Sequence, residues 1–197
     1  MENLDQQIKK NGFNSGVLLG VIILVLGIFT FYLITGMTTS LVVVIGGPII
    51  LSVLVPIALA VFFCIGLRKK IGGFWTFKQA VTGIFIMFFT AYVIQAVFSD
   101  LIFAKFVEPQ MVEKVDNAVM SATKTMMEKA NTPQETIDSK VADMQKQFDD
   151  QKNVTMGKTI SGILISILFR FVFALIFAAM FKREPLKPTT DYVDPAV

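Results

Sequence analysis

Four long apolar runs divide the chain, and each is about as long as a helix that crosses a lipid bilayer. Such a helix needs about 20 predominantly apolar residues. The runs occupy residues 15–35, 41–67, 77–103 and 158–181. The second run is longer than needed, and Gly46-Gly47-Pro48 is expected to mark the start of its spanning helix. The chain has no amphipathic segments that could cover four buried helices, so the pattern predicts four transmembrane helices.

Between the third and fourth runs, apolar residues recur every three or four positions, as on one face of an α-helix. Two such stripes are Met111, Val115, Ala118, Val119, Ala122 and Met126, and then Ile137, Val141, Met144 and Phe148. Thr132, Pro133 and Glu135 lie between the stripes and predict an N-cap, a first helical position and a capping box. The predicted fold is therefore all-α, a four-helix transmembrane bundle with an extracytoplasmic helical hairpin between helices three and four.

This pattern divides the chain into three parts. Residues 1–106 hold a short N-terminal segment and the first three transmembrane helices, residues 107–156 the hairpin, and residues 157–197 the fourth helix and a short tail. The two stripes of the hairpin either pack on each other or dock a partner protein or a second copy. Six methionines between residues 111 and 156 supply adaptable apolar surface for such contacts.

Basic residues indicate which way the helices cross. They flank the apolar runs at Lys9 and Lys10, at Arg68, Lys69, Lys70 and Lys78, and at Lys182, Arg183 and Lys187. If four helices alternate in direction, all three groups fall on one side, which the positive-inside rule assigns to the cytoplasm. The first run, from Val17 to Ile34, is too long for the apolar region of a signal peptide. We therefore expect a retained first helix and two cytoplasmic termini.

Composition agrees with a membrane protein and argues against several other classes. Hydrophobic residues make up 54% of the chain, charged residues only 17%, and the mean hydropathy is +0.65. The net charge of +3 lies mostly beside the apolar runs, which favours lipid over nucleic acid as the partner. The chain has no histidine and a single cysteine, Cys64. No nucleophile–base pair, metal-ligand spacing or cofactor motif is visible, so we expect no enzyme activity, metal or cofactor.

The loop between the second and third runs is the most distinctive stretch. It reads Arg68-Lys69-Lys70-Ile71-Gly72-Gly73-Phe74-Trp75-Thr76-Phe77-Lys78-Gln79-Ala80. With Phe103-Ala104-Lys105-Phe106-Val107-Glu108-Pro109 and Lys182-Arg183-Glu184-Pro185, it resembles an uncharacterised family of bacterial four-helix membrane proteins, a domain of unknown function. The resemblance covers nearly the whole chain. It implies the fold and a location in the bacterial inner membrane, but no reaction, ligand or site residue.

Two interpretations of this loop follow from its residues. In the first, Gly72 and Gly73 allow a sharp turn and Thr76 caps the third helix. Its aromatic residues, Phe74, Trp75 and Phe77, then anchor the loop at the membrane interface. In the second, a phosphate or lipid headgroup binds at the loop. The contacts would come from Arg68, Lys69 and Lys70 and from the N–H groups of Gly72 and Gly73.

Arg170 is a charge inside the fourth apolar run. It lies 12 residues before Lys182, about 18 Å along a helix and near mid-membrane. An arginine there costs about 2.5–3.5 kcal/mol on insertion scales, so it should face protein or water. Small residues share its helix face, namely Gly162, Ser166, Ala174 and Ala178. This ridge, Gly162 and Ser166 included, predicts close helix packing on both sides of the arginine.

Depth along the helices predicts the partners of Arg170. Pro56 is 12 residues before Arg68, level with Arg170, and is expected to bend the second helix and free the carbonyl of Ser52. Tyr92 and Gln95 lie about 21 and 26 Å from the start of the third helix, close to the same depth. Asp100 lies about 15 Å from Arg170 along the membrane normal, too far for an ion pair unless the helices are offset.

We expect Arg170 to bond Tyr92, Gln95 and freed carbonyls, directly or through water. This cluster either pins the bundle or forms a path for an anion, a lipid or a proton; arginine holds its proton, which disfavours a relay. Another packing signal is a glycine ridge, Gly12, Gly16 and Gly20, which indicates close contact within the bundle or with a second copy. Two functions remain open. One is a non-catalytic accessory or structural subunit that contacts a membrane or periplasmic partner through the hairpin. The other is a small transporter or channel-like protein with an anion or lipid site at Arg170.

Overall fold

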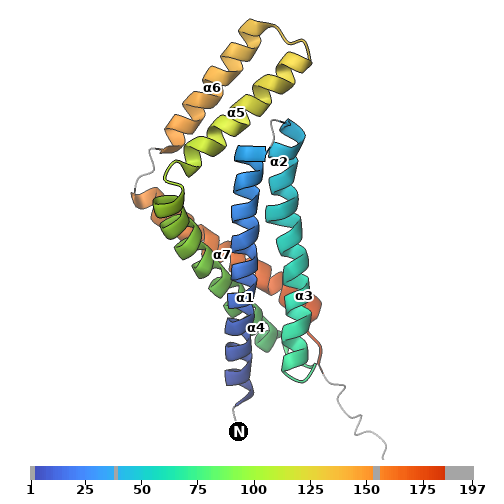
Figure 1. Ribbon diagram of the computed structural model, residues 1–197. Coiled ribbons are helices and arrows are strands. Elements are labelled where there is room, and N and C mark those ends of the chain that lie inside the picture. The colour runs from blue at the N-terminus through green and yellow to red at the C-terminus, as the bar shows by residue number, and fades with distance from the viewer. Residues whose placement is uncertain (1–2, 38–39, 153–155, 185–197) are drawn as a thin grey trace, which may run out of the picture.

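Four long apolar helices and a polar helical hairpin make up the computed structural model, which describes residues 3–37, 40–152 and 156–184 (Figure 1). The first long helix joins α1 (Leu4–Tyr32) to η1 (Leu33–Met37), and the second joins α2 (Leu41–Ile49), η2 (Ile50–Leu54) and α3 (Val55–Lys70). The third joins α4 (Phe77–Gln95) to η3 (Ala96–Val107), and the fourth is α7 (Met156–Phe181). All four are long and apolar enough to cross a membrane, which confirms the predicted fold class.

The two ends of the bundle differ in charge and in what they carry. The N-terminal end of α1, the loop between α3 and α4, and the C-terminal end of α7 lie together (Figure 1). We call this the basic end, because Lys9, Lys10, Arg68, Lys69, Lys70, Lys78, Lys182 and Arg183 belong to these segments. The hairpin, α5 (Met111–Lys129) and α6 (Gln134–Lys152), stands at the other end, which we call the hairpin end.

The largest helix–helix interface in the described structure joins α1 and α4, and the glycine ridge of α1 forms it. A Cβ atom at Gly12 would lie 2.8 Å from the carbonyl oxygen of Gly83, and one at Gly16 would lie 2.6 Å from that of Met87. A Cβ atom at Gly20 would lie 3.0 Å from the Cα atom of Ala91. The two backbones therefore touch along three helical turns, so in this chain the ridge packs within the bundle.

The buried core fills the basic half of the bundle. Its members come from all four long helices and from the loop between α3 and α4, and include Ile8, Leu19, Cys64, Leu67, Trp75, Ile84, Met87, Ala174 and Ala178. Gly83 lies at the crossing point, where an added Cβ would come within 3.1–3.3 Å of Ile8, Leu67 and Trp75. The close packing here thus depends on the absence of a side chain at Gly83 and on the large side chains that surround it.

The loop at the basic end is tied to the end of α7. The backbone N–H of Trp75 donates to the carbonyl of Arg183 at 2.9 Å, and the N–H of Arg183 donates back at 3.3 Å. The indole Nε1–H donates to the carbonyl of Phe181 at 2.9 Å, one of the last carbonyls of that helix. Trp75 is 1% exposed. The expectation of an interfacial anchor is therefore wrong for Trp75, because its indole satisfies a helix terminus inside the fold.

Two other expectations for this loop are confirmed. Gly72 and Gly73 have φ values of 98° and 84°, which residues with a side chain rarely adopt. The hydroxyl of Thr76 accepts from the N–H of Gln79, whose side chain accepts from the N–H of Thr76, so a complete capping box begins α4. The chain thus reverses sharply and enters the third long helix with its first donors satisfied.

The second long helix starts earlier than the sequence suggested. It begins at Leu41 and continues through Gly46, Gly47 and Pro48, so these residues do not mark its start. At the expected bend, the π-helical turn η2 ends at Leu54, two residues before Pro56, and the N–H of Val55 donates to the carbonyl of Ile50, five residues earlier. Since proline has no N–H and its ring crowds the preceding turn, the wider π turn accommodates Pro56 within a continuous helix.

The hairpin rests on the ends of the first two long helices. α5 packs on α2 and η1, while α6 packs on α5, where Ala122 and Ile137 are buried. α6 begins at Gln134 and the carbonyl of Pro133 accepts the N–H of Ile137, so Pro133 precedes the helix, one position earlier than predicted. The hydroxyl of Tyr32 and the ammonium of Lys114 both donate to Glu108. The bond from Lys114 lowers the pKa of the Glu108 carboxyl below its ordinary value.

Gly16→Ala tests the contact between α1 and α4. The added methyl group would collide with the Met87 backbone and the Thr90 Cβ atom, 2.7 Å away, so the helices must separate. We expect a loss of about 1–3 kcal/mol in the free energy of unfolding, measured by denaturant titration in detergent micelles. Gly27→Ala is the matched control on the same helix, because nothing lies within 4 Å of its added Cβ. Equal stability of the two variants would contradict the proposed contact.

Candidate functional site

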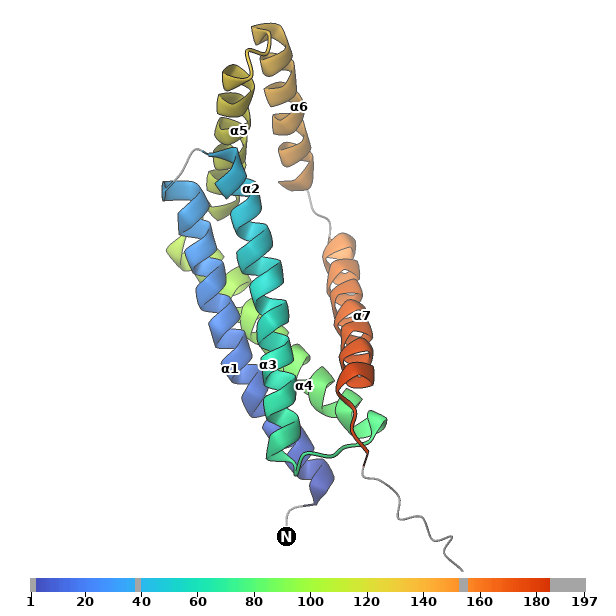
Figure 2. The same cartoon turned by 90° about the vertical axis from the view of Figure 1, so that its right-hand side faces the viewer.

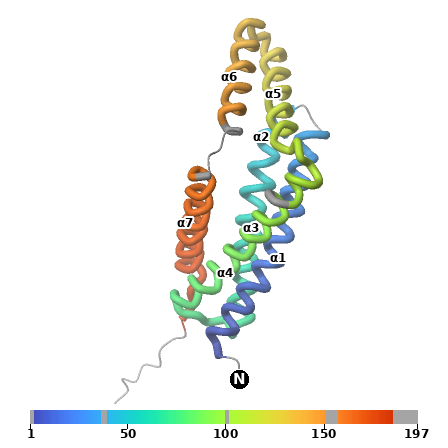
Figure 3. Tube along the Cα trace, turned by 90° about the vertical axis from the view of Figure 1, so that its left-hand side faces the viewer, coloured from blue at the N-terminus to red at the C-terminus, as the bar shows by residue number. Residues whose placement is uncertain are grey.

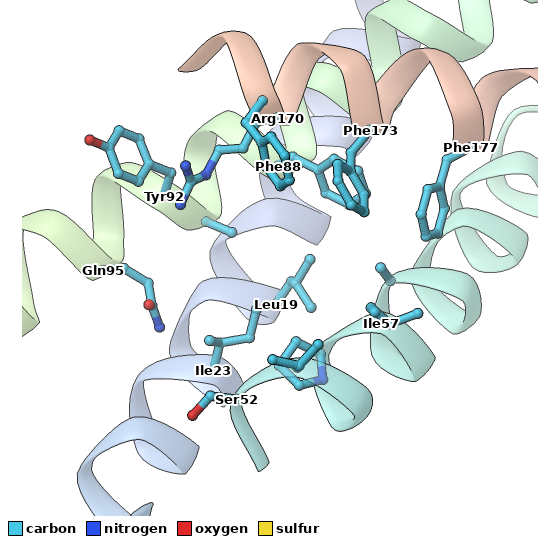
Figure 4. Close-up of a pocket in the computed structure, with 15 residues that line it drawn as sticks. Leu19, Ile23, Ser52, Ile57, Phe88, Tyr92, Gln95, Arg170, Phe173 and Phe177 are labelled. Atoms are coloured by element: carbon cyan, nitrogen blue, oxygen red, sulfur yellow. The ribbon is translucent and has the colours of Figure 1, made fainter. Parts of the chain in front are cut away.

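A cavity of about 360 Å³ lies inside the bundle between α3 and α7, with α1 and α4 behind it (Figure 4). Its apolar wall comes from all four long helices: Leu19, Ile23, Val53, Ile57, Ala60, Phe88, Ala91, Phe169, Phe173 and Phe177. The remaining lining residues are Ser52, Pro56, Tyr92, Gln95 and Arg170. The cavity is thus mostly apolar, with a small polar group of residues in its wall, as is typical of small-molecule sites.

Arg170 is the charged residue of this wall, and three features fix its position. Its Nη1 donates to the carbonyl of Ser166, one turn earlier on α7, at 2.8 Å. Its Cζ atom lies 4.0 Å from the centroid of the Tyr92 ring, so the guanidinium covers the ring face. The side chain is half-buried and extends from α7 toward α4 (Figure 4). The negative face of the ring partly compensates the charge through a cation–π interaction.

The structure brings most of the predicted cluster to one place. Ser52, Pro56, Tyr92 and Gln95 all line the cavity that Arg170 lines. The recorded contact with Tyr92 is to its ring face, and the carbonyl that Arg170 bonds is that of Ser166 rather than that of Ser52. The side chain of Asp100, also assigned to the cluster, lies outside the described part of the structure.

The packing of α7 explains why the cavity exists. At the basic end, Ala174 and Ala178 are completely buried and bring α7 close to its neighbours. Toward the hairpin end, Gly157 through Ile165 are exposed, and α7 stands apart from α3 (Figure 2). A Cβ at Gly162 would meet nothing within 4 Å. The expectation of close packing at Gly162 is therefore wrong, because no helix faces that half of α7 within the described structure.

The cavity is open along its side. Three lining residues on its rim are substantially exposed: Val53 is 48% exposed, Ile57 42% and Phe169 62%. They belong to η2, α3 and α7, the segments that flank the gap. Because these helices are apolar enough to cross a membrane, the opening faces the region that acyl chains fill.

The second candidate site, the basic loop, has a different arrangement from the one expected. The N–H of Gly72 donates to the carbonyl of Lys69 at 3.3 Å, and that of Gly73 donates to the carbonyl of Arg68 at 2.9 Å. These two bonds close the C-terminus of α3. In the interpretation in which the loop binds a phosphate or lipid headgroup, both glycine N–H groups are expected to contact it, but in the structure both already donate to carbonyls of α3. Lys69 and Lys70 are exposed and Arg68 is half-buried at the same end.

Another cavity, of about 520 Å³, lies at the hairpin end where α5 rests on the bundle. Tyr32, Glu108 and Lys114 line it, together with Asn117 and Ser121. Tyr32, Glu108 and Lys114 already form the hydrogen-bond network that joins the ends of α1 and η3 to α5. Within the described residues, no group of three or more His, Cys, Asp or Glu side chains could hold a metal ion. This cavity thus belongs to the support of the hairpin.

Sequence reasoning missed the aromatic part of the Arg170 cavity. Phe169, Phe173 and Phe177 recur every four residues on α7, and Phe88 faces them from α4. The Phe88 and Phe177 rings lie 5.5 Å apart, nearly perpendicular, and close the cavity toward the basic end. The spacing was visible in the sequence, but phenylalanine is common on lipid-facing helices. Only tertiary packing distinguishes the rings that line a cavity from those that contact lipid.

Fold and site together define a multi-pass α-helical membrane protein with an arginine-containing cavity that opens to the side. The chain belongs to the family described as "Protein of unknown function (DUF4199)", whose model matches residues 14–183. This match confirms the family resemblance found in the sequence. No curated protein and no solved structure matches the chain.

Tyr92→Phe and Tyr92→Leu test the contact between Arg170 and the ring. Phenylalanine keeps the ring face and should retain most of the stability. Leucine removes it and should lower the free energy of unfolding by about 0.5–2 kcal/mol relative to the phenylalanine variant, the usual range for a cation–π contact. Denaturant titration in one detergent gives both values. If the two variants were equally stable, the ring would not contribute to holding Arg170.

Proposed function

We propose that this protein is a non-catalytic membrane protein that binds an amphiphilic molecule in the cavity beside Arg170. The observation that supports this function most directly is a half-buried guanidinium in the wall of an apolar cavity that opens between two membrane helices. Such a site offers hydrogen-bond donors to a polar group and apolar surface to the rest of the same molecule. It favours the second of the two functions left open by the sequence.

We propose the bacterial inner membrane as the location, with the basic end in the cytoplasm. Eight lysine and arginine residues of the described chain belong to the segments at that end, and the positive-inside rule assigns such an end to the cytoplasm. The hairpin then lies outside the cytoplasm. In this orientation the exposed half of α7 and the open side of the cavity lie toward the outer leaflet, so the bound molecule would come from there.

Ser52→Trp tests whether the cavity binds a molecule. Ser52 lines the cavity from η2, so an indole there would occupy the space. We expect a lipid or other amphiphile to remain with the protein purified in mild detergent and to be lost from the variant, as measured by mass spectrometry of extracts. Val42→Trp is the control, because Val42 is 81% exposed on the same long helix and does not line the cavity. Equal amounts in all three proteins would refute cavity binding.

A second candidate function is that of an accessory subunit that contacts a partner through the hairpin. Two observations favour it: α6 packs mainly on α5, so the hairpin projects from the bundle, and Met126 on α5 is 54% exposed. Against it, most of the apolar stripe of α5 is already partly covered by its neighbours within the described structure. The partner would be a membrane or periplasmic protein or a second copy of the chain.

Met126→Glu tests this candidate. A carboxylate in the centre of an apolar contact is strongly unfavourable, so a partner held there should be lost in co-purification from native lipid. Lys124→Glu, also exposed on α5, introduces a carboxylate beside the apolar position and should retain the partner. The hairpin candidate is wrong if the wild-type protein and Met126→Glu retain the same proteins in the same amounts.

A further inference from the structure

The charge of Arg170 points to the chemistry of the molecule in the cavity. None of the lining residues is acidic, and no ion pair of Arg170 is recorded within the described residues. A guanidinium carries five N–H donors, and the recorded bond to Ser166 comes from Nη1. A cation at this depth is costly unless it has partners. An anion that accepts several of the remaining donors would therefore complement the site.

The cavity wall contains other polar side chains that can donate hydrogen bonds to a bound anion. Gln95 on α4 and Ser52 on η2 line the same cavity as Arg170, and Ser52 lies across the cavity from it (Figure 4). The Gln95 amide and the Ser52 hydroxyl are both donors. A carboxylate matches a guanidinium edge through two parallel hydrogen bonds and retains lone pairs for a further donor. The wall thus contains donors on two sides of the cavity and, among the described side chains, no carboxylate that would compete with a bound anion.

The rest of the cavity excludes a small hydrated anion. Leu19, Ile23, Phe88, Phe173 and Phe177 form its floor and its closed end, and the rim residues Val53, Ile57 and Phe169 are apolar too. An inorganic ion would lose its water against these side chains and gain nothing from them. A molecule with an anionic group at one end and an apolar chain gains from both parts of the wall.

The depth of Arg170 in the membrane favours some anionic amphiphiles over others. Arg170 lies 11 residues before the end of α7 at Phe181 and 14 after its start at Met156, about 17 and 21 Å along the axis. The headgroup of a two-chain phospholipid would have to leave the interface and travel about 15 Å into the hydrocarbon to reach it. A carboxylate is the smallest acidic group that can do so. The volume of about 360 Å³ also suits one chain better than two.

We infer that the cavity binds the carboxylate of a single-chain amphiphile, a long-chain fatty acid, with Arg170 as its anchor. The inference rests on the proposed function, that the cavity binds an amphiphile. The carboxylate lies against the guanidinium of Arg170. The acyl chain of the fatty acid runs along Leu19 and Ile23 and leaves the cavity between Ile57 and Phe169. Arg170 contributes charge and geometry, and the aromatic end of the cavity excludes water from the ion pair.

Oleate and oleyl alcohol, which differ in their polar group, provide the test. Both are titrated as radiolabelled probes into the full-length protein in lipid nanodiscs. We expect the wild-type protein to bind oleate at least tenfold more tightly than oleyl alcohol. Arg170→Gln should abolish this preference by weakening oleate binding, whereas Lys158→Gln, which removes a positive charge from the exposed end of the same helix, should retain it. Excess phosphatidylglycerol should fail to displace oleate.

The outcomes separate this inference from the proposed function. If oleate and oleyl alcohol bind equally, and Ser52→Trp prevents binding of both, the cavity binds amphiphiles but the carboxylate inference is wrong. Displacement of oleate by excess phosphatidylglycerol would also overturn it, in favour of a two-chain lipid. If neither probe binds and nothing is retained on purification, both are wrong. The comparison of the two probes uses the wild-type protein, so it holds even if Arg170→Gln fails to fold.

Discussion

The close approach of the α1 and α4 backbones determines how everything else is arranged. Gly12, Gly16 and Gly20 allow α1 to touch the carbonyl oxygens of Gly83 and Met87, so these two helices form a single rigid pair. α3 packs on α1, and α7 packs mainly on α4, each from its own side. A space therefore remains between α3 and α7, with the rigid pair as its back wall. The cavity thus results from which helices pack on each other.

The two halves of the fourth long helix, α7, differ in how they pack. Its basic half, with Ala174 and Ala178 buried, holds the bundle together, and its other half is exposed. Arg170 lies where one half gives way to the other. A charge deeper in the packed half would lack access to a ligand, and one in the exposed half would face acyl chains without a partner. At the boundary, the ring of Tyr92 and the carbonyl of Ser166 stabilise the guanidinium while one side of it faces the cavity. The groups that hold Arg170 in place, the ring of Tyr92 and the carbonyl of Ser166, therefore leave one side of the guanidinium open to the cavity.

Much of this arrangement could be predicted from local patterns, and the errors share a cause. Length and periodicity were sufficient for the four long helices and the hairpin, and counting residues placed Tyr92, Gln95 and Pro56 at the depth of Arg170, where they line one cavity. The same small-residue spacing occurs around Gly16 and around Gly162, yet one packs on a backbone and the other faces open space. A small residue permits close approach but does not supply the neighbour. Likewise, the Gly72 and Gly73 N–H groups donate to carbonyls at the end of α3, and Trp75 is buried against α7, so the fold already supplies the partners that the sequence assigned to a headgroup or to the membrane interface.

The backbone pairing of Trp75 with Arg183 makes α7 a lever with one fixed end. The helix has 26 residues, so it extends about 39 Å from Phe181, where the indole holds it. A tilt of about 10° about that point moves Arg170 by about 3 Å and the far end of the helix by about 7 Å. The width of the cavity mouth is therefore several times more sensitive to such a tilt than the contacts near the pivot are.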